Sequence, residues 1–444
     1  MFSIHFRCSL TLPQIDRIRW HLFPEFRIRP PIQGSLFEAG QRLDSPLVVP
    51  DLMRIMDLQQ EQLARSLGDG HRVIHGVAGS GKTMILGYRC VELAKRYSKP
   101  ILVLCYNKAL ASRLAQQLAV YRMDGRITVR NFHGWCLDQL GAYGVPRPRS
   151  NDDPHAWLRE MVKAVSAGVE SRAIPRAQYS AVLIDEGHDF EPEWLKLVTQ
   201  MIDPDSNSLL LLYDDAQTIY GGGRKKFSFA SVGIQAKGRT TILRLNYRNT
   251  LEVLSTARIF ANELLTAQDA DDDHVPVIAP ESAGRRGPVP ELVSASTIWE
   301  ESKIIGERIA GAIADGSCPS EFGVLCRTRA VGNLIAKQLD KGGLPVRLMT
   351  DSSTRVQLAE APAITVMTMH ASKGLEFESV FLPSLCDVGA RRDLSGEELA
   401  QEAKLVYVAM TRALSKLTML HHCHTPITDR LCAAVKEVRQ RVAA

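Results

Sequence analysis

The sequence lacks the features that define several large classes of protein. No run approaches the about 18 consecutive apolar residues of a membrane-spanning helix. Residues 1–7, MFSIHFR, show neither the long apolar run nor the small-residue cleavage site of a signal peptide. Nine cysteines are scattered over 444 residues without a C-x-x-C pair, a usage typical of reduced, mostly buried thiols. We therefore expect a cytoplasmic protein with no membrane partner.

Neither sign of charge is in large excess. The chain carries 54 Lys and Arg against 49 Asp and Glu, a formal charge of +5. This balance permits a nucleic-acid partner without requiring one, because a local basic groove matters more than the total charge.

Two clusters of possible metal ligands are not expected to bind a metal. His421-His422-Cys423-His424 places ligands side by side with no distant partner cluster, which is poor zinc geometry. The run Asp271-Asp272-Asp273 lies in a stretch rich in Pro and Gly, where a solvated loop is expected.

Short β-branched and leucine-rich runs alternate with longer helical patterns along most of the chain. This alternation predicts an α/β fold with parallel sheets and crossover helices. The expected strands are Arg72–His75, Ile101–Tyr106, Ile127–Asn131, Ala181–Ile184, Leu209–Tyr213, Phe322–Cys326, Ile364–Thr368, Val380–Leu382 and Leu417–Leu420.

The length is too great for one ordinary domain and predicts two or three. We expect a proline-rich arm at 1–50 and a first domain at 51–266 with a small insertion at about 136–179. Residues 267–290, rich in Asp, Pro and Gly, are expected to link it to a second domain at 291–444.

Residues 76–83, GVAGSGKT, match the phosphate-loop pattern G-x-x-x-x-G-K-[ST] between an expected strand and an expected helix. The glycines allow a tight turn whose N–H groups point at phosphate oxygens, the lysine supplies a charge for the β/γ-phosphates, and the threonine hydroxyl can ligate Mg²⁺. The predicted nucleotide-binding positions are Gly76, Val77, Ala78, Gly79, Ser80, Gly81, Lys82 and Thr83.

A phosphate loop needs an acidic partner at the end of another buried strand. Asp185 and Glu186 follow the apolar run 181–184. Asp185 is predicted to hold Mg²⁺ with Thr83, and Glu186 to polarise the attacking water. The sequence therefore predicts a magnesium-dependent NTPase.

Four later segments complete a motif set. Residues 209–220 read LLLLYDDAQTIY, 245–250 LNYRNT, 368–377 TMHASKGLEF and 405–413 LVYVAMTRA. With the phosphate loop and the acid pair, they resemble a UvrD/Rep-type superfamily 1 helicase, in order, from about residue 58 to 420. The resemblance implies two RecA-like P-loop domains with ATP in the cleft between them.

The resemblance also implies roles for residues outside the phosphate loop. Gln60 is similar to the family's adenine-reading glutamine, with Gln59 and Gln62 as alternatives. The remaining implied positions are Gln217 as γ-phosphate sensor, Arg248 and Arg412 as arginine fingers, and Glu376 as a nucleotide-site residue.

In this family the track is single-stranded DNA, or a duplex with a 3′ tail, followed 3′ to 5′. Matching strand-contact positions are Tyr106, Asn107, Lys108, Phe132, His133, Tyr220, Arg327, His370 and Lys373. An aromatic side chain there offers a stacking face to a base. For Phe132 and Trp135, a place in the core stays equally open.

The sequence departs from the family in three places. Gly187-His188 replaces the usual pair after the two acids, and the interval 327–370 lacks the family's large accessory insertion. Unwinding is therefore a weaker expectation than translocation. Residues 10–25 resemble the segment that joins a NERD-type nuclease-related domain to such a helicase, so a nuclease or repair protein is an expected partner.

The leading hypothesis is an ATP-driven 3′–5′ DNA translocase or helicase acting in repair, recombination or defence. Two alternatives stay open: an RNA-directed motor of the same superfamily, and an ATP-gated DNA-binding subunit of a nuclease–helicase complex with little activity of its own.

Overall fold

The computed structural model describes residues 52–123, 125–149, 153–213, 228–261, 281–282, 284–349, 362–388 and 396–443. The expected arm at 1–50, the predicted sites Gln217 and Tyr220, and the acidic run 271–273 lie outside these ranges. Within them, no helix is both long and apolar enough to cross a bilayer.

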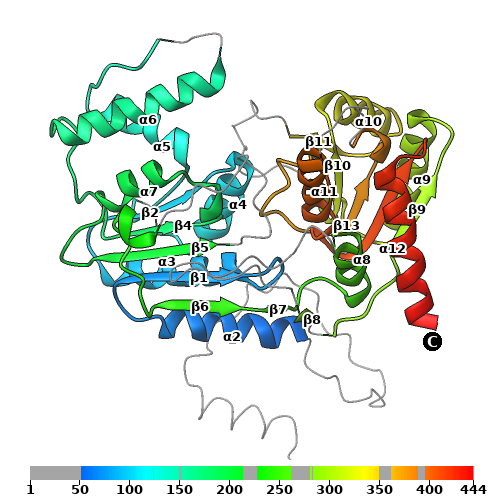
Figure 1. Cartoon of the computed structure of the whole chain (residues 1–444), viewed down its shortest axis with the longest axis horizontal. Coiled ribbons are helices and arrows are strands. Elements are labelled where there is room, and N and C mark those ends of the chain that lie inside the picture. Colours follow the sequence, from blue (N-terminus) through cyan, green and yellow to red (C-terminus); the bar gives the residue numbers. More distant parts are fainter. Residues whose placement is uncertain are drawn as a thin grey trace, which may run out of the picture. The chain divides into compact units, whose positions relative to one another are not determined.

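The first lobe is built on a six-stranded sheet in the order β3-β2-β4-β5-β1-β6 (Figure 1). Every strand pair is parallel. The strands are β1 (His71–Gly76), β2 (Ile101–Cys105), β3 (Ile127–Asn131), β4 (Ala181–Ile184), β5 (Ser208–Tyr213) and β6 (Thr240–Leu243). β2, β4 and β5 are buried along their whole length, which explains why they are nearly continuous apolar runs in the sequence.

Helices cover both faces of this sheet. One apolar cluster contains Ile85, Leu86 and Leu110, and another contains Trp135, Met161 and Leu195. The helices are α2 (Leu52–Ser66), α3 (Lys82–Arg96), α4 (Lys108–Ala119), α5 (Phe132–Ala142), α6 (Pro154–Glu170) and α7 (Pro192–Thr199), with short 3₁₀ turns η1 (Gly187–Asp189) and η3 (Phe229–Val232). The expected insertion therefore consists of most of α5 together with α6, and α5 and α6 pack against each other.

The second lobe repeats the architecture with the strand order β11-β12-β10-β13-β14-β9, again parallel throughout. Its strands are β9 (Glu291–Ser294), β10 (Phe322–Cys326), β11 (Val346–Leu348), β12 (Ile364–Thr368), β13 (Phe377–Leu382) and β14 (Ala413–His421). Its helices are α9 (Ile298–Ala314), α10 (Arg329–Lys341), α11 (Gly396–Met410) and α12 (Pro426–Ala443), with 3₁₀ turns η4 (Pro319–Glu321) and η5 (Leu385–Asp387). The predicted fold class, two α/β lobes with parallel sheets, is confirmed.

The division between the lobes differs from the expected one. A two-strand ladder joins β7 (Leu245–Asn246) to β8 (Glu281–Ser282), and α8 (Leu251–Ala261) follows β7. The buried face of α8 packs in the second lobe's core, against α11, α12 and β14. The first lobe therefore ends before α8 and not at 266, because the apolar face of that helix is completed by later segments.

We predict that Phe260→Ala on α8 destabilises the second lobe. Phe260 is 1% exposed in the second lobe's apolar cluster, so its truncation should lower the free energy of unfolding by about 3–5 kcal/mol. Hydrogen exchange should show the lost protection in α11 and α12. Val120→Ala, at a position 72% exposed in the first lobe, is the control and should change stability by less than about 0.5 kcal/mol. Loss of protection concentrated in β1–β5 would contradict the assignment of α8.

Candidate functional site

The phosphate loop joins β1 to α3 and depends on its glycines. Gly79 and Gly81 have φ of 68° and 82°, the left-handed region that glycine adopts without strain. A Cβ on Gly79 would lie 2.7 Å from Oδ1 of Asn246, and one on Gly81 would lie 2.3 Å from Oη of Tyr247. The LNYRNT segment therefore packs directly over the loop, and side chains at the two glycines would push it away.

Lys82 and Thr83 begin α3 and point to different parts of the site. The buried Lys82 ammonium donates to the carbonyl oxygens of Gly76 and Val77, at 3.0 Å for the second. The Thr83 hydroxyl donates to Oδ2 of Asp185 at 2.9 Å. Two predicted metal ligands from separate elements are thus in contact, and their oxygen donors suit Mg²⁺.

The acid pair lies at the carboxyl end of β4 and is buried. Burial raises the pKa of Asp185 to about 7, the charge of Glu186 adds to the rise, and Thr83 and Lys82 oppose it. Oε2 of Glu186 is buried without a hydrogen-bond partner among the described residues and lies 3.4 Å from Nε2 of His188. A buried carboxylate oxygen with no donor is suited to accept a hydrogen bond from a water or a cation's water shell.

The glycine at position 187, the first residue of the departure, has a steric reason. A Cβ on Gly187 would lie 2.3 Å from Cδ1 of Leu211 and 3.0 Å from the carbonyl oxygen of Leu212, so β5 leaves no room for a side chain. Glu186 itself adopts φ 55°, ψ 45°, and His188 packs edge-on against Tyr213 with ring centroids 5.7 Å apart. The turn after β4 is therefore pressed against β5.

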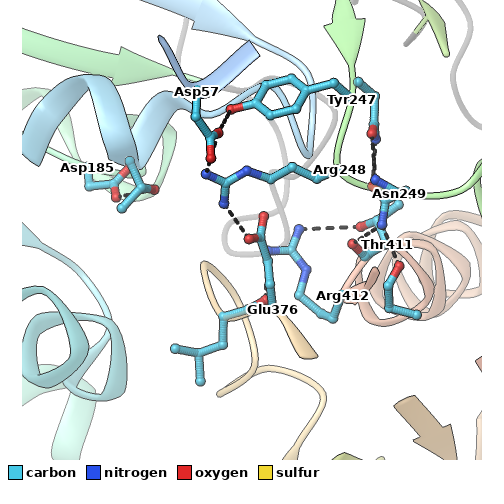
Figure 2. Close-up of polar contacts among 12 residues, drawn as sticks. Asp57, Asp185, Tyr247, Arg248, Asn249, Glu376, Thr411 and Arg412 are labelled. Carbon is cyan, nitrogen blue, oxygen red and sulfur yellow. Dashed lines mark hydrogen bonds and ion pairs between the residues drawn. The ribbon is translucent and has the colours of Figure 1, made fainter. Parts of the chain in front are cut away.

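One pocket is lined by the phosphate loop, by Glu186 and by three groups from later in the chain, Arg248, Glu376 and Arg412. Figure 2 shows the two guanidinium groups on either side of the Glu376 carboxylate, with Arg248 bonded to it. Tyr247 donates to Oδ1 of Asp57 at 2.7 Å. The structure thus brings together predicted nucleotide-site residues from both lobes.

Backbone contacts hold Arg412 in place. Its Nε donates to the carbonyl of Val408 at 3.0 Å, and the side chain is buried. The amide of Asn249 donates to the carbonyls of Thr411 and Ala413 at 2.9 and 2.6 Å, so the LNYRNT segment and the residues around Arg412 are bonded together.

Arg113 on α4 was not predicted from the sequence. Burial alone would raise the pKa of Glu376, but Arg248, Arg113 and Arg412 lower it. Three guanidinium groups therefore act on one carboxylate, and Asp57 lies 3.9 Å from one of them, Arg248. The position of Arg113 in its helix does not indicate this role, because Glu376, Arg248 and Arg412 lie far from it in the sequence.

Gln60 on α2 is buried and lies against the loop, since a Cβ on Gly81 would come within 3.1 Å of its Cγ. Its reading of an adenine base stays a prediction, as does the choice of Gln60 over Gln59 and Gln62.

Direct bonds join the strand-contact segments of the two lobes. Nζ of Lys373 lies 2.7 and 2.8 Å from the two carboxylate oxygens of Asp189, and both side chains are 2% exposed. Nδ2 of Asn107, the N-cap of α4, donates to the carbonyl of Ala371 at 2.8 Å. In this structure Lys373 therefore serves as a buried link between the lobes, and its contact with the strand or the nucleotide stays a prediction.

Phe132 differs from its predicted role. It is fully buried and stacks on Trp194, with ring centroids 4.7 Å apart and an interplanar angle of 16°. Trp194 in turn stacks parallel to Tyr106 at 6.1 Å. The core position left open for Phe132 and Trp135 is the observed one, because both rings are covered by protein, and Trp194 is an aromatic neighbour that the motif did not reveal.

The remaining strand-contact residues lie at the ends of β-strands. Lys108 is exposed at the start of α4, and burial, followed by the charge of Lys108, lowers the pKa of His133 to about 4. Arg327 donates to both carboxylate oxygens of Glu402 at 2.7 and 2.6 Å. Burial and then Arg327 lower the pKa of His370. Binding of DNA by these residues stays a prediction.

Two parallel-sheet lobes, a phosphate loop, a buried acid pair and arginines lining one pocket define a P-loop NTPase with two RecA-like lobes. Residues 59–223 match the family described as an AAA domain, and residues 348–423 match the UvrD-like helicase C-terminal domain. These two matches confirm the resemblance to UvrD/Rep-like helicases of superfamily 1 that the motifs indicated.

The chain is similar in sequence to several named relatives over limited segments. The mitochondrial ATP-dependent DNA helicase HMI1 of Saccharomyces cerevisiae is 29% identical over 38% of this chain and 24% of its own length. A putative ATP-dependent DNA helicase, YjcD of Bacillus subtilis, is 28% identical over 38% of this chain and 22% of its own length. DNA helicase II of Escherichia coli is 39% identical over 13% of this chain and 9% of its own length. The matched segments span less than a quarter of these relatives. Among solved structures, S. cerevisiae Dbp5 bound to RNA and ADP BeF3 aligns with a TM-score of 0.45 at 11% identity, over 88% of this chain and 91% of that one.

We predict that Lys373→Met destabilises the protein by about 3–5 kcal/mol, because it leaves the buried Asp189 carboxylate without its cation. Burial already raises the pKa of Asp189 to about 6 against the opposing charge of Lys373. The double variant Lys373→Met/Asp189→Leu should recover much of the loss in denaturant unfolding. Lys416→Met, at an exposed position on β14, is the matched control. Equal free energies of unfolding for Lys373→Met and Lys416→Met would show that the Lys373–Asp189 pair does not contribute to stability.

Proposed function

We propose that this protein is an ATP-driven translocase that moves 3′ to 5′ on single-stranded DNA, with DNA helicase activity on a duplex carrying a 3′ tail. The pocket that contains the phosphate loop, Glu186, Arg248 and Arg412 carries this proposal, because the groups needed for phosphoryl transfer come from both lobes. Names of relatives matched over short segments support DNA as the track.

In the proposed reaction, backbone N–H groups of the phosphate loop and Lys82 hold the phosphates of ATP. Thr83 and Asp185 would hold Mg²⁺, which supplies charge neutralisation of the phosphate oxygens when bound. Glu186 orients the attacking water through its buried Oε2, which accepts no hydrogen bond from the described residues, and accepts its proton.

Arg248 and Arg412 stabilise the charge that develops on the transferred phosphoryl group. Arg248 is bonded to Glu376 in this structure. A γ-phosphate entering the pocket would compete with that carboxylate for the guanidinium. Nucleotide binding therefore exchanges a contact inside the protein for a contact to the ligand, and loss of the γ-phosphate reverses the exchange.

The same lobes present the proposed DNA contacts. The Asn107–Ala371 hydrogen bond joins the segment of Tyr106 and Lys108 to the segment of His370. If the lobes part after hydrolysis, this bond and the Lys373–Asp189 pair must break. Alternate gripping by the two lobes then becomes stepwise movement along the strand.

We predict that single-stranded DNA strongly raises the steady-state ATPase rate. Lys82→Ala should abolish turnover because the phosphate loop loses its buried charge, and Glu186→Gln should lower kcat by at least about 100-fold while ATP still binds. Lys95→Ala, an exposed lysine on the same helix α3, is the matched control. A rate indifferent to DNA, or one raised more by a matched RNA strand, would contradict the proposal.

Polarity is tested separately by streptavidin displacement from biotinylated oligonucleotides. We expect ATP-dependent displacement from the 5′ end and slow displacement from the 3′ end, because a motor moving 3′ to 5′ runs into the 5′ block. Glu186→Gln serves as the inactive control. Preferential displacement from the 3′ end would reverse the assigned direction.

A further inference from the structure

Three segments of the second lobe meet at one edge of its sheet. In the strand order, β13, β14 and β9 are neighbours and run parallel, so their carboxyl ends lie at the same edge. The turn η5 follows β13, His421 ends β14 and residues 422–424 follow it, and α9 begins shortly after β9. Figure 1 shows β9, α9 and α12 together in this lobe.

A fully buried carboxylate lies at this meeting point. Glu301, in the first turn of α9, is 0% exposed. Its Oε1 lies 2.7 Å from Nδ1 of His422, and its Oε2 accepts a hydrogen bond from the N–H of Ser384 at 2.6 Å. A buried carboxylate needs such partners, and an imidazole and an amide supply them here.

The sulfur of Cys386 lies in the same cluster. The backbone N–H groups of His422 and Cys423 both donate to this Sγ, at 3.1 and 3.0 Å. Two N–H donors on one sulfur stabilise the thiolate, which is the form that binds metals. Burial raises the pKa of the Cys386 thiol to about 11, with a hydrogen bond to the Cys423 side chain as the next cause. The 3.0 Å bond from its N–H places the backbone of Cys423 beside the Cys386 sulfur.

We propose that Glu301, Cys386, His422 and Cys423 bind one zinc ion. The ligand atoms of the first three all lie within 4.8 Å of one another, and tetrahedral bonds of 2.0–2.3 Å require a spacing of about 3.3–3.8 Å. A bound zinc would therefore replace the 2.7 Å contact between Glu301 and His422 and draw the Cys386 sulfur inward. The Cys423 sulfur lies outside this set of three and would turn toward the metal. Two thiolates, an imidazole and a carboxylate select zinc over the harder Mg²⁺ and Ca²⁺.

From the sequence, no metal site was expected at residues 421–424, and the fold explains why the structure leads to a different inference. His421-His422-Cys423-His424 has no partner cluster nearby in the chain. In the folded lobe, two other segments supply the partner ligands, because Cys386 follows β13 and Glu301 follows β9. The metal would join three segments of the second lobe. No residue of this cluster lines the pocket of the phosphate loop, so its role is structural.

The test is the metal content of the full chain, purified without chelator and measured by mass spectrometry. We expect one zinc per chain. Cobalt substituted for it should show the thiolate-to-metal charge-transfer band and the strong visible bands of a tetrahedral site. Added zinc should raise the Tm of metal-depleted protein by mass action.

Cys386→Ser and His422→Gln should each remove the bound zinc or weaken binding by at least about 100-fold, and should lose the zinc-dependent Tm shift. The matched controls are Cys318→Ser and His424→Gln, whose side chains lie outside the four-ligand set. Because Cys386 is buried, the half-exposed His422 gives the variant less prone to misfolding. Less than stoichiometric zinc, equal zinc in ligand and control variants, or a disulfide between Cys386 and Cys423 would each overturn the proposal.

Discussion

The arrangement of the two lobes depends on buried charges that meet across them. Lys373 and Asp189 form an ion pair with both side chains 2% exposed, and such a pair is tolerated only when each member satisfies the other. Asp189 lies four residues after Asp185, and Lys373 lies three residues before Glu376. This one contact therefore positions the predicted metal ligand of the first lobe and the arginine-bound carboxylate of the second. Separation of the lobes would expose both charges to water, so opening is not prohibitively costly.

The guanidinium groups around Glu376 make the pocket responsive to anions. Arg113, Arg248 and Arg412 all lower the pKa of that carboxylate. In the proposed reaction, the phosphates of the nucleotide interact with the same guanidinium groups as Glu376. Gain and loss of a γ-phosphate would therefore alter the fit between the lobes.

Much of the fold was predictable because its strands are buried on both faces. β2, β4, β5 and β10 are short apolar runs bounded by polar turns, and all were predicted to within about one residue. β6, β9 and β11 were missed because they alternate or are half-exposed and carry no such run. The location of α8 in the second lobe was also out of reach, since its apolar face does not reveal which core completes it.

The candidate site likewise contains features that the sequence predicts and features that it does not. The phosphate loop, the acid pair and the two arginines were predictable, because short motifs encode their local geometry and the structure brings them to one pocket. Arg113, the buried state of Lys373 and the covering of Phe132 by Trp194 depend on contacts between distant segments. So does the cluster of Glu301, Cys386 and His422. The sequence shows the residues of these contacts but not their partners.

The central claim is that a residue of the second lobe completes a nucleotide site built on the first. The most direct test is the kcat for ATP of Arg412→Ala at saturating single-stranded DNA, with binding of a fluorescent ATP analogue measured alongside. The account predicts that kcat falls by about 10³-fold or more while the analogue still binds, because the guanidinium acts on the transition state. An unchanged kcat would show that the second lobe takes no part in hydrolysis and would contradict the account.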